Sequence, residues 1–436
     1  MAKKGDIVAG VDFGGREVRV MIVQQQPNGM VRLLGHGTAP SKGCVRQGFI
    51  QNSQAAQAAF SAAMEAAGRN AQLRVQSVFC GVNAPSAVSS IREGKVATTG
   101  GVVELENIDE ARSHAEQGMM APAMRALSSV TSQEWLVDGL QVADPLGIRG
   151  GVLHTRMHFA QVPEVVLDNL RSCIEAQDCV VEDMVYMPIA SALGCMTPED
   201  MQLGTAVVDF GDASTSVAVY RNGCIMGTKT FEFGAALIIN DLAGILKVPF
   251  DEAFALLEEY GVGMQQIRGL RQDAADGEVA ALLEKHGAGA ERGQKMVKLN
   301  KTVGGAPDHV PLTTVEGIIF ARAKQLMEKV SRFLIQHQLR THLVRGLVLT
   351  GGGAGIRNIA ALAEAVCDTN VRIGLPEGVE MIPQSLNIPS VTPVAGVVRH
   401  GLAYRAALHS GRIDRRAGRK KGPLDKIIKF LKKWFF

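Results

Sequence analysis

Val11-Asp12-Phe13-Gly14 stands near the start of the chain, and the same four residue types recur at Val208-Asp209-Phe210-Gly211. Apolar β-forming residues precede both copies, and an alternating run follows each copy, from Val18 to Val23 and from Ser216 to Tyr220. Each unit predicts a β-hairpin whose first strand ends in an aspartate and a glycine turn. Because the units are about 200 residues apart, we expect two similar lobes that face each other across a cleft.

A third strand-and-turn unit lies near the end of the chain, where the apolar run Gly346 to Thr350 leads into Gly351-Gly352-Gly353 and a helical pattern from Asn358 to Val366. Glycine turns at strand ends let backbone N–H groups approach phosphate oxygens, and an aspartate at a strand end can hold a hydrated Mg²⁺. We therefore expect the three turns to converge on a nucleotide. The first two turns would contact its phosphates, and the third would contact its adenosine.

Helical patterns separate these hairpins, with apolar residues at three- and four-residue spacing from Ser53 to Ala67 and from Pro163 to Glu175. Mixed strands and helices indicate an α/β fold. Short strands from Gly81 to Ala160 interrupt the pattern and predict a small inserted domain. Residues 262–311 are polar and glycine-rich around the helical segment Glu278 to Lys285, and predict a further subdomain.

Length and composition fit about three globular domains, because 436 residues with 46% hydrophobic and 20% charged residues can bury substantial cores. The formal charge of +3 is uneven: residues 411–436 contain ten Lys or Arg and two Asp, which leaves a net of −5 on residues 1–410. The net positive charge therefore belongs to one tail. This argues against a body that binds nucleic acid and for a tail that contacts an acidic surface. Scattered cysteines and the lack of a long apolar stretch predict a reduced chain in the cytoplasm.

The last residues of the chain form an amphipathic pattern. At about 100° per residue, the apolar residues of 424–435 share one face and the four lysines share the other, and only the terminal Phe436 falls outside this pattern. A helix of this length, roughly 18 Å, cannot cross a hydrocarbon core of about 30 Å, so we expect it to lie in the plane of an anionic membrane. An alternative is a helix that docks on the body or on a partner. The expected membrane contacts are Leu424, Lys426, Ile427, Ile428, Lys429, Phe430, Leu431, Lys432, Lys433, Trp434 and Phe435.

These motifs resemble those of a known superfamily. Gly10 to Gly14 resembles the first phosphate motif of the actin and heat-shock ATPases, Thr205 to Ser216 the second, and Leu347 to Gly353 the adenosine motif. Within that superfamily the chain is most similar to FtsA, the cell-division family, through Thr341 to Pro376 and through Asp144-Pro145-Leu146-Gly147. The resemblance covers nearly the entire chain.

The resemblance implies an α/β, actin-like fold, in which duplicated ribonuclease-H-like lobes surround a nucleotide cleft. It also implies an inserted small α/β subdomain and a C-terminal amphipathic helix. The expected division is 1–80 with 163–203 for the first lobe, 81–162 for the insertion, 204–242 with 313–408 for the second lobe, 243–312 for its smaller subdomain, 409–423 for a basic linker and 424–436 for the membrane helix.

The resemblance also implies a site for ATP with Mg²⁺. Its expected residues are Asp12, Gly14, Gly15, Asp209, Gly211, Ser214, Thr215, Gly234, Gly351, Gly352 and Gly353. No catalytic residue and no metal held by protein ligands alone is predicted.

The phosphate motifs diverge from the family pattern. Asp212 and Ala213 stand where the family has phosphate-facing glycines, and Glu17 stands in place of a lysine. Like charges at about 4 Å cost on the order of 1 to 4 kcal/mol at effective dielectric constants of about 80 to 20, unless Mg²⁺ or Arg16 compensates. We therefore expect weakened nucleotide binding and slow or absent hydrolysis, at most a weak ATPase. The alternative is that Asp212 points to solvent and ATP binds normally.

As an FtsA-like protein, the chain is expected to be a peripheral protein on the cytoplasmic side of the inner membrane at the division site. It would tether FtsZ filaments through the FtsZ C-terminal peptide, self-associate into filaments and recruit later division proteins. Arg322 is the candidate contact for that acidic peptide, the alternative being an ordinary surface arginine. Two other functions remain open: an actin-like pilus-assembly protein at the inner membrane, and a small-molecule kinase of the same superfamily.

Overall fold

The computed structural model describes residues 6–41, 43–98, 100–117, 122–275, 295–300 and 308–409. The helix expected over Glu278 to Lys285, most of the basic linker and the amphipathic segment 424–436 lie outside these residues. Within the described ranges, no helix has both the length and the apolar character of a bilayer-spanning segment.

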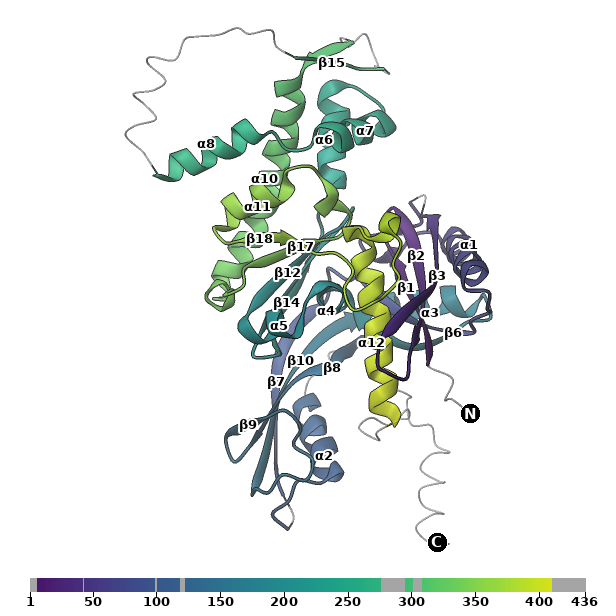
Figure 1. The fold of residues 1–436 in the computed structure, drawn as a ribbon, viewed down its shortest axis with the longest axis vertical. Helices are drawn as coiled ribbons and strands as arrows, with labels where there is room; N and C mark the ends of the chain where they lie inside the picture. The colour runs from purple at the N-terminus through teal and green to yellow at the C-terminus, as the bar shows by residue number, and fades with distance from the viewer. Residues whose placement is uncertain are drawn as a thin grey trace.

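Two five-stranded sheets share one topology and form the centres of two lobes (Figure 1). In each sheet the first three strands form an antiparallel meander, and two more strands pair in parallel beyond the first strand. The duplication read from the two Val-Asp-Phe-Gly segments therefore extends to the whole sheet. The first sheet contains β3 (Val31–Pro40), β2 (Glu17–Gln25), β1 (Ile7–Phe13), β6 (Ser77–Val82) and β11 (Val180–Tyr186), and the second contains β14 (Cys224–Phe231), β13 (Thr215–Arg221), β12 (Thr205–Phe210), β17 (Leu347–Thr350) and β18 (Val371–Ile373).

The central strands read as continuous apolar runs because helices cover both faces of each sheet. Every residue of β12 is buried, as are six of the seven residues of β1. In the first lobe, α1 packs on β2 and β3, and its N-terminus is capped by Asn52, whose side chain accepts a hydrogen bond from the backbone of Ala55. The helices of the two lobes are α1 (Ser53–Ala71), α3 (Glu164–Glu175), α4 (Met187–Cys195), α5 (Pro198–Leu203), α10 (Leu312–Gln336), α11 (Ile359–Cys367) and α12 (Thr392–His409).

A separate four-stranded sheet lies below the lobes in Figure 1. Its strand order is β7-β10-β8-β9, and α2 packs on β7 and β10. Gly81 and Val82 still belong to β6 of the first sheet, so the strands of the insertion begin after them. The elements are β7 (Val88–Ala97), α2 (Leu105–Glu116), β8 (Met124–Val137), β9 (Leu140–Val142) and β10 (Val152–Pro163).

A hydrogen-bonded triangle, with His158 and Thr228 buried and Ser89 partly buried, connects the insertion to the second lobe. The Nε2 atom of His158 on β10 lies 2.8 Å from Ser89 Oγ on β7 and 2.9 Å from Thr228 Oγ1 on β14. The Thr228 hydroxyl also donates to Ser89 Oγ at 3.1 Å. Burial lowers the pKa of His158 to about 4, so the imidazole is neutral near pH 7.

Two helices run between the lobes, where α4 crosses α12 (Figure 1). Their backbones are in close contact at two glycines. A Cβ atom on Gly396 would lie 1.6 Å from the carbonyl oxygen of Ala190, and one on Gly194 would lie 2.1 Å from that of Thr392. Only glycine permits this approach. Contact between the two backbones therefore fixes the point at which α4 crosses α12.

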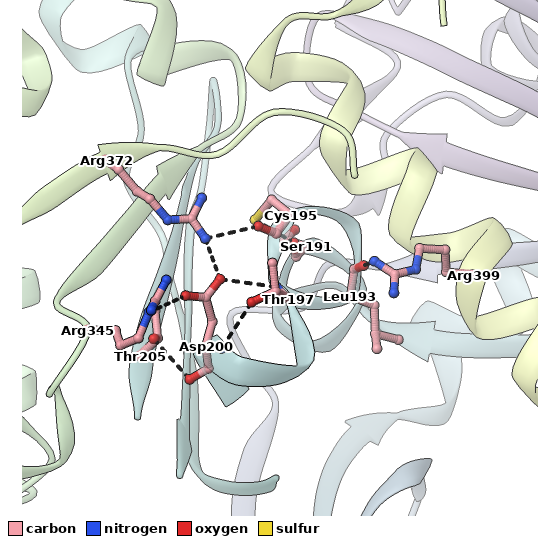
Figure 2. Close-up of polar contacts among 9 residues, drawn as sticks. All are labelled: Ser191, Leu193, Cys195, Thr197, Asp200, Thr205, Arg345, Arg372 and Arg399. Atoms are coloured by element: carbon pink, nitrogen blue, oxygen red, sulfur yellow. Dashed lines mark hydrogen bonds and ion pairs between the residues drawn. The ribbon is translucent and has the colours of Figure 1, made fainter. Parts of the chain in front are cut away.

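A charged cluster ties the end of α4 to the second lobe (Figure 2). The carboxylate of Asp200 is almost fully buried and accepts hydrogen bonds from Arg345 Nε at 2.9 Å and Arg372 Nη2 at 2.6 Å. Asp200 also belongs to the capping box of α5: its carboxylate accepts a hydrogen bond from the backbone N–H of Thr197, and its own backbone N–H donates to the Thr197 hydroxyl. Arg399 of α12 donates to the carbonyl of Leu193 nearby.

The upper part of the second lobe carries the smaller elements that follow its sheet (Figure 1). Helices α6 and α7 pack on each other and on α10, whose apolar residues join the second core. The elements are α6 (Ala236–Leu246), α7 (Phe250–Tyr260), α8 (Met264–Ala275), β15 (Met296–Lys298) and β16 (His309–Pro311), and the hairpin β4 (Val45–Arg46) and β5 (Phe49–Ile50) lies in the first lobe.

Candidate nucleotide-binding site

The two repeated turns have the same internal hydrogen bond. The backbone N–H of Gly14 donates to the carbonyl of Glu17 at 3.1 Å, and that of Gly211 donates to the carbonyl of Ser214 at 3.0 Å. A Cβ atom at Gly14 or Gly211 would lie within 2.8 Å of the accepting oxygen. Each lobe therefore has a tight turn at the end of its first strand, and the glycine that opens the turn occupies a position with no room for a side chain.

Two buried carboxylates lie at the base of these loops. Asp209 Oδ2 accepts a hydrogen bond from Ser191 Oγ at 2.7 Å, and Asp12 lies opposite Arg19 in the β1–β2 ladder. Burial raises the pKa of Asp12 to about 7. The negative charge of Asp209 raises this pKa further, whereas the Arg19 guanidinium lowers it. Burial also raises the pKa of Asp209 to about 6, opposed by Ser191 and Arg19. A hydrated divalent cation would supply the counter-charge that these groups need.

The loops enclose a narrow cavity of about 100 Å³, which opens beside a larger one of about 420 Å³. The larger cavity has apolar walls suited to a nucleobase, while Asp212, Gly352 and Ser390 line both cavities. The apolar lining comes from Ile239, Phe254, Leu257, Ile356 and Ile388. The two spaces together have the form of a nucleoside pocket with a phosphate channel.

The third turn separates these spaces. Gly351 has φ +83°, and a Cβ atom there would lie 2.2 Å from Asp209 Oδ1, so only glycine fits. A Cβ atom on Gly353 would lie 2.5 Å from the Phe210 ring, whereas Gly352 faces open space. Gly351 and Gly353 therefore allow close packing, and Gly352 presents backbone to the cavities.

Two charged residues of the first loop, Glu17 and Arg16, have partners within the chain. Glu17 Oε2 accepts a hydrogen bond from Arg19 Nη2 at 2.7 Å. The Arg16 guanidinium stacks on the Phe254 ring at 3.5 Å from its centroid, which joins the first lobe to α7 across the cleft. Asp212 Oδ2 lies 3.0 Å from the point that a Cβ atom of Gly15 would occupy. Burial raises the pKa of Asp212, and Arg16 opposes this effect.

Comparisons with known proteins find the family that the sequence motifs resemble. The model of the family "Cell division protein FtsA" matches residues 206–396, which include the second and third turns. FtsA of Neisseria meningitidis is 26% identical over 423 residues, covering 96% of both chains, and FtsA of Escherichia coli K12 is 23% identical over 403 residues, covering 91% of this chain and 90% of that one. The chain is similar to FtsA proteins over nearly its full length.

Solved structures confirm the actin-like fold. The chain is similar to a structure of the PilM-PilN type IV pilus biogenesis complex, with a TM-score of 0.58 at 15% identity, covering 91% of this chain and 98% of that one. It is also similar to MreB5 of Spiroplasma citri bound to ADP, with a TM-score of 0.52 at 12% identity, covering 93% and 98%. The likeness to FtsA in sequence and to these proteins in structure extends over both lobes.

Most of the residues expected from the FtsA resemblance lie together. Those that line the narrow cavity are Asp12, Gly14, Gly15, Asp209, Gly211, Ser214, Gly351 and Gly352, and Gly353 lines the larger one. Thr215 and Gly234 line neither of these two cavities. The Thr215 hydroxyl donates to the carbonyl of Phe233 at 2.7 Å, and Gly234 packs against the backbone of Gly211 and Asp212. These two residues support the second loop on the side away from the cavities.

Three further residues of the cavities were not anticipated. Asn83 Nδ2 donates to Ser214 Oγ at 2.5 Å across the cleft, and its Oδ1 atom is buried without a partner among the described residues. Met187, at the start of α4, gives the narrow cavity an apolar wall, and Phe254 gives the larger one an aromatic wall. Asn83 directly follows the apolar strand Ser77–Val82, so a polar residue at a strand end was the available signal.

Arg322, the expected peptide contact, lies on α10 outside the cleft. Its Nε and Nη2 atoms donate to the two carboxylate oxygens of Asp241 at 2.6 and 2.9 Å, and its side chain is 30% exposed. This bidentate pair raises the pKa of Arg322. The expected membrane residues, 424–435, lie outside the described part of the chain.

Proposed function

We propose that this protein is a cell-division scaffold that tethers FtsZ filaments to the cytoplasmic face of the inner membrane. In this role it self-associates and recruits later division proteins at the division site. The similarity to FtsA proteins over nearly the full chain supports the proposal. The observation that carries the tethering step is the clean separation of apolar residues and lysines in residues 424–436.

Vesicle co-sedimentation tests the membrane step. Full-length protein should sediment with phosphatidylglycerol vesicles, and deletion of residues 424–436 should abolish this. Phe430→Ala removes an aromatic ring from the apolar face, whereas Phe436→Ala removes one outside it. Burying a Phe side chain contributes about 1.5 to 3 kcal/mol, so Phe430→Ala should weaken binding about ten-fold or more and Phe436→Ala much less. Equal effects of the two changes would contradict the amphipathic arrangement.

We also propose that the cleft binds adenine nucleotide with Mg²⁺ and turns it over slowly or not at all. The apolar walls suit the nucleobase, the glycine loops suit phosphates, and Asp12 with Asp209 suits the hydration shell of the cation. Slow turnover is supported by the carboxylate of Asp212, which lines the narrow cavity and opposes the negative charge of a polyphosphate. Sub-micromolar binding of Mg-ATP in isothermal titration, together with steady phosphate release, would refute weakened catalysis.

The third proposed element is recognition of the acidic FtsZ C-terminal peptide near α10, with Arg322 as its cation. Because Asp241 already holds this guanidinium, the peptide carboxylate must share or displace that partner. Fluorescence anisotropy of a labelled peptide should show lost binding for Arg322→Glu and equal or tighter binding for Asp241→Asn. Arg332→Glu, an exposed charge reversal on the same helix, is the matched control. Unchanged affinity in Arg322→Glu would remove this residue from the contact.

A further inference from the structure

Asp212 lies at the junction of the two cavities of the cleft. It lines the larger, apolar-walled cavity and also the narrow one between the glycine loops. Its Oδ2 atom is only 3.0 Å from the position that a Cβ atom of Gly15 would take on the opposite loop. The carboxylate therefore stands in the gap between the two loops.

A nucleotide in this cleft would place its phosphates past this gap. The nucleobase fits the larger cavity, between Phe254, Leu257 and Ile356. The phosphate chain must then extend into the narrow cavity, toward Asp12 and Asp209, and each added phosphoryl group brings more negative charge to the space between the loops. The number of phosphates thus decides how strongly Asp212 opposes the ligand.

Among the charged side chains of the cavities, Arg16 alone partly offsets Asp212. Among the described residues that line them, the cations are Arg16 and Arg19 and the anions are Asp12, Glu17, Asp209, Asp212 and Glu258. Arg19 pairs with Glu17, and Arg16 stacks on Phe254. A divalent cation would balance Asp12 and Asp209, which leaves Asp212 facing a polyphosphate with Arg16 as the nearest compensating charge.

We infer that Asp212 is a specificity-determining residue that makes the cleft select a nucleoside diphosphate over the triphosphate. This inference rests on the nucleotide site proposed above and adds the preferred ligand. The carboxylate acts by its charge, so an uncharged side chain of the same size should remove the preference.

Isothermal titration with Mg-ADP and Mg-ATP tests the inference. The wild-type protein should bind ADP more tightly than ATP. Asp212→Asn should tighten ATP binding about ten-fold or more and ADP binding much less, because one like charge at this range changes affinity by that order. Asp212→Gly should shift the ratio of the two affinities at least as far. The side chain of Asp212 makes no hydrogen bond within the described residues, so both variants should keep the wild-type melting temperature.

Glu258→Gln is the matched control, because it removes one negative charge from the nucleoside side of the same cleft and should leave the ratio unchanged. Wild-type protein that binds ATP as tightly as ADP, or an Asp212→Asn variant with the wild-type ratio, overturns the inference while the nucleotide site stands. If adenosine, ADP and ATP all fail to bind the wild type and both variants, the nucleotide site itself is wrong and the inference falls with it.

Discussion

Asp12→Asn should remove much of the pH dependence of stability in the metal-free protein. Burial raises the pKa of Asp12 from an ordinary 3.8 to about 7, so between these values the folded state binds more protons than the unfolded state. Stability then falls as pH rises, which is the reverse of the usual carboxylate behaviour. An asparagine keeps the shape of the side chain and carries no charge.

The size of the effect follows from the two pKa values. Between pH 5.5 and 8, ionisation of Asp12 should lower the free energy of unfolding by about 2 kcal/mol, and Asp209, with a pKa of about 6, should lower it by about 1 kcal/mol. The wild type should therefore lose about 3 kcal/mol from these groups and Asp12→Asn about 1 kcal/mol. Other titrating groups are common to both proteins, so the difference between the two slopes isolates Asp12.

Urea unfolding followed by circular dichroism at several pH values, with EDTA present, measures these slopes. Asp178→Asn is the control, because this carboxylate is exposed and lies outside the cleft. Addition of Mg²⁺ should stabilise the wild type at pH 8 more than Asp12→Asn, since the cation replaces the missing protons. Identical pH slopes in the wild type and Asp12→Asn would refute the reasoning.

Three further predictions concern the scaffold of the site. Gly351→Ala should destabilise the protein by on the order of 1 to 3 kcal/mol or more, because of its positive φ and its contact with Asp209, while Gly352→Ala should have little effect in the same thermal melt. Asp200→Ala should lower the free energy of unfolding by about 2 kcal/mol, because two half-exposed arginines lose their buried partner. As the control, Glu199→Ala should keep a melting temperature near the wild-type value. The ring protons of His158 should not shift in NMR spectra between pH 5 and 8, since its pKa is about 4; a titration in that range would contradict its burial.

Much of the fold could be predicted from local patterns. The strand expected from Val18 to Val23 is part of β2, and the one from Ser216 to Tyr220 is part of β13. Helix α1 extends four residues beyond the predicted Ala67, because Gly68 continues the helix and Gln72 ends it in a left-handed conformation. Periodicity identifies an element well, but its end depends on a cap that the pattern does not contain.

The site was predictable where it consists of glycine turns and of the aspartates at the ends of the strands before them. The glycine turns are visible in the sequence as glycines that follow apolar runs, and all three turns line one cavity in the structure. Side-chain direction is harder, since neighbouring residues at a strand start point to opposite faces: Ser214 meets Asn83 across the cleft, while Thr215 is buried behind the loop. The pairing of Arg322 with Asp241, 81 residues apart, depends on tertiary packing and has no local signal.

The triangle of His158, Ser89 and Thr228 gives the insertion two attachments. The chain enters and leaves it through β6 and α3 of the first lobe, but its hydrogen bonds reach β14 of the second. If the lobes rotate about the α4–α12 crossing, either these bonds break or the insertion moves together with the second lobe. Small angular changes at the cleft would then become large displacements at the far tip near β9, where a neighbouring subunit or another protein could sense them.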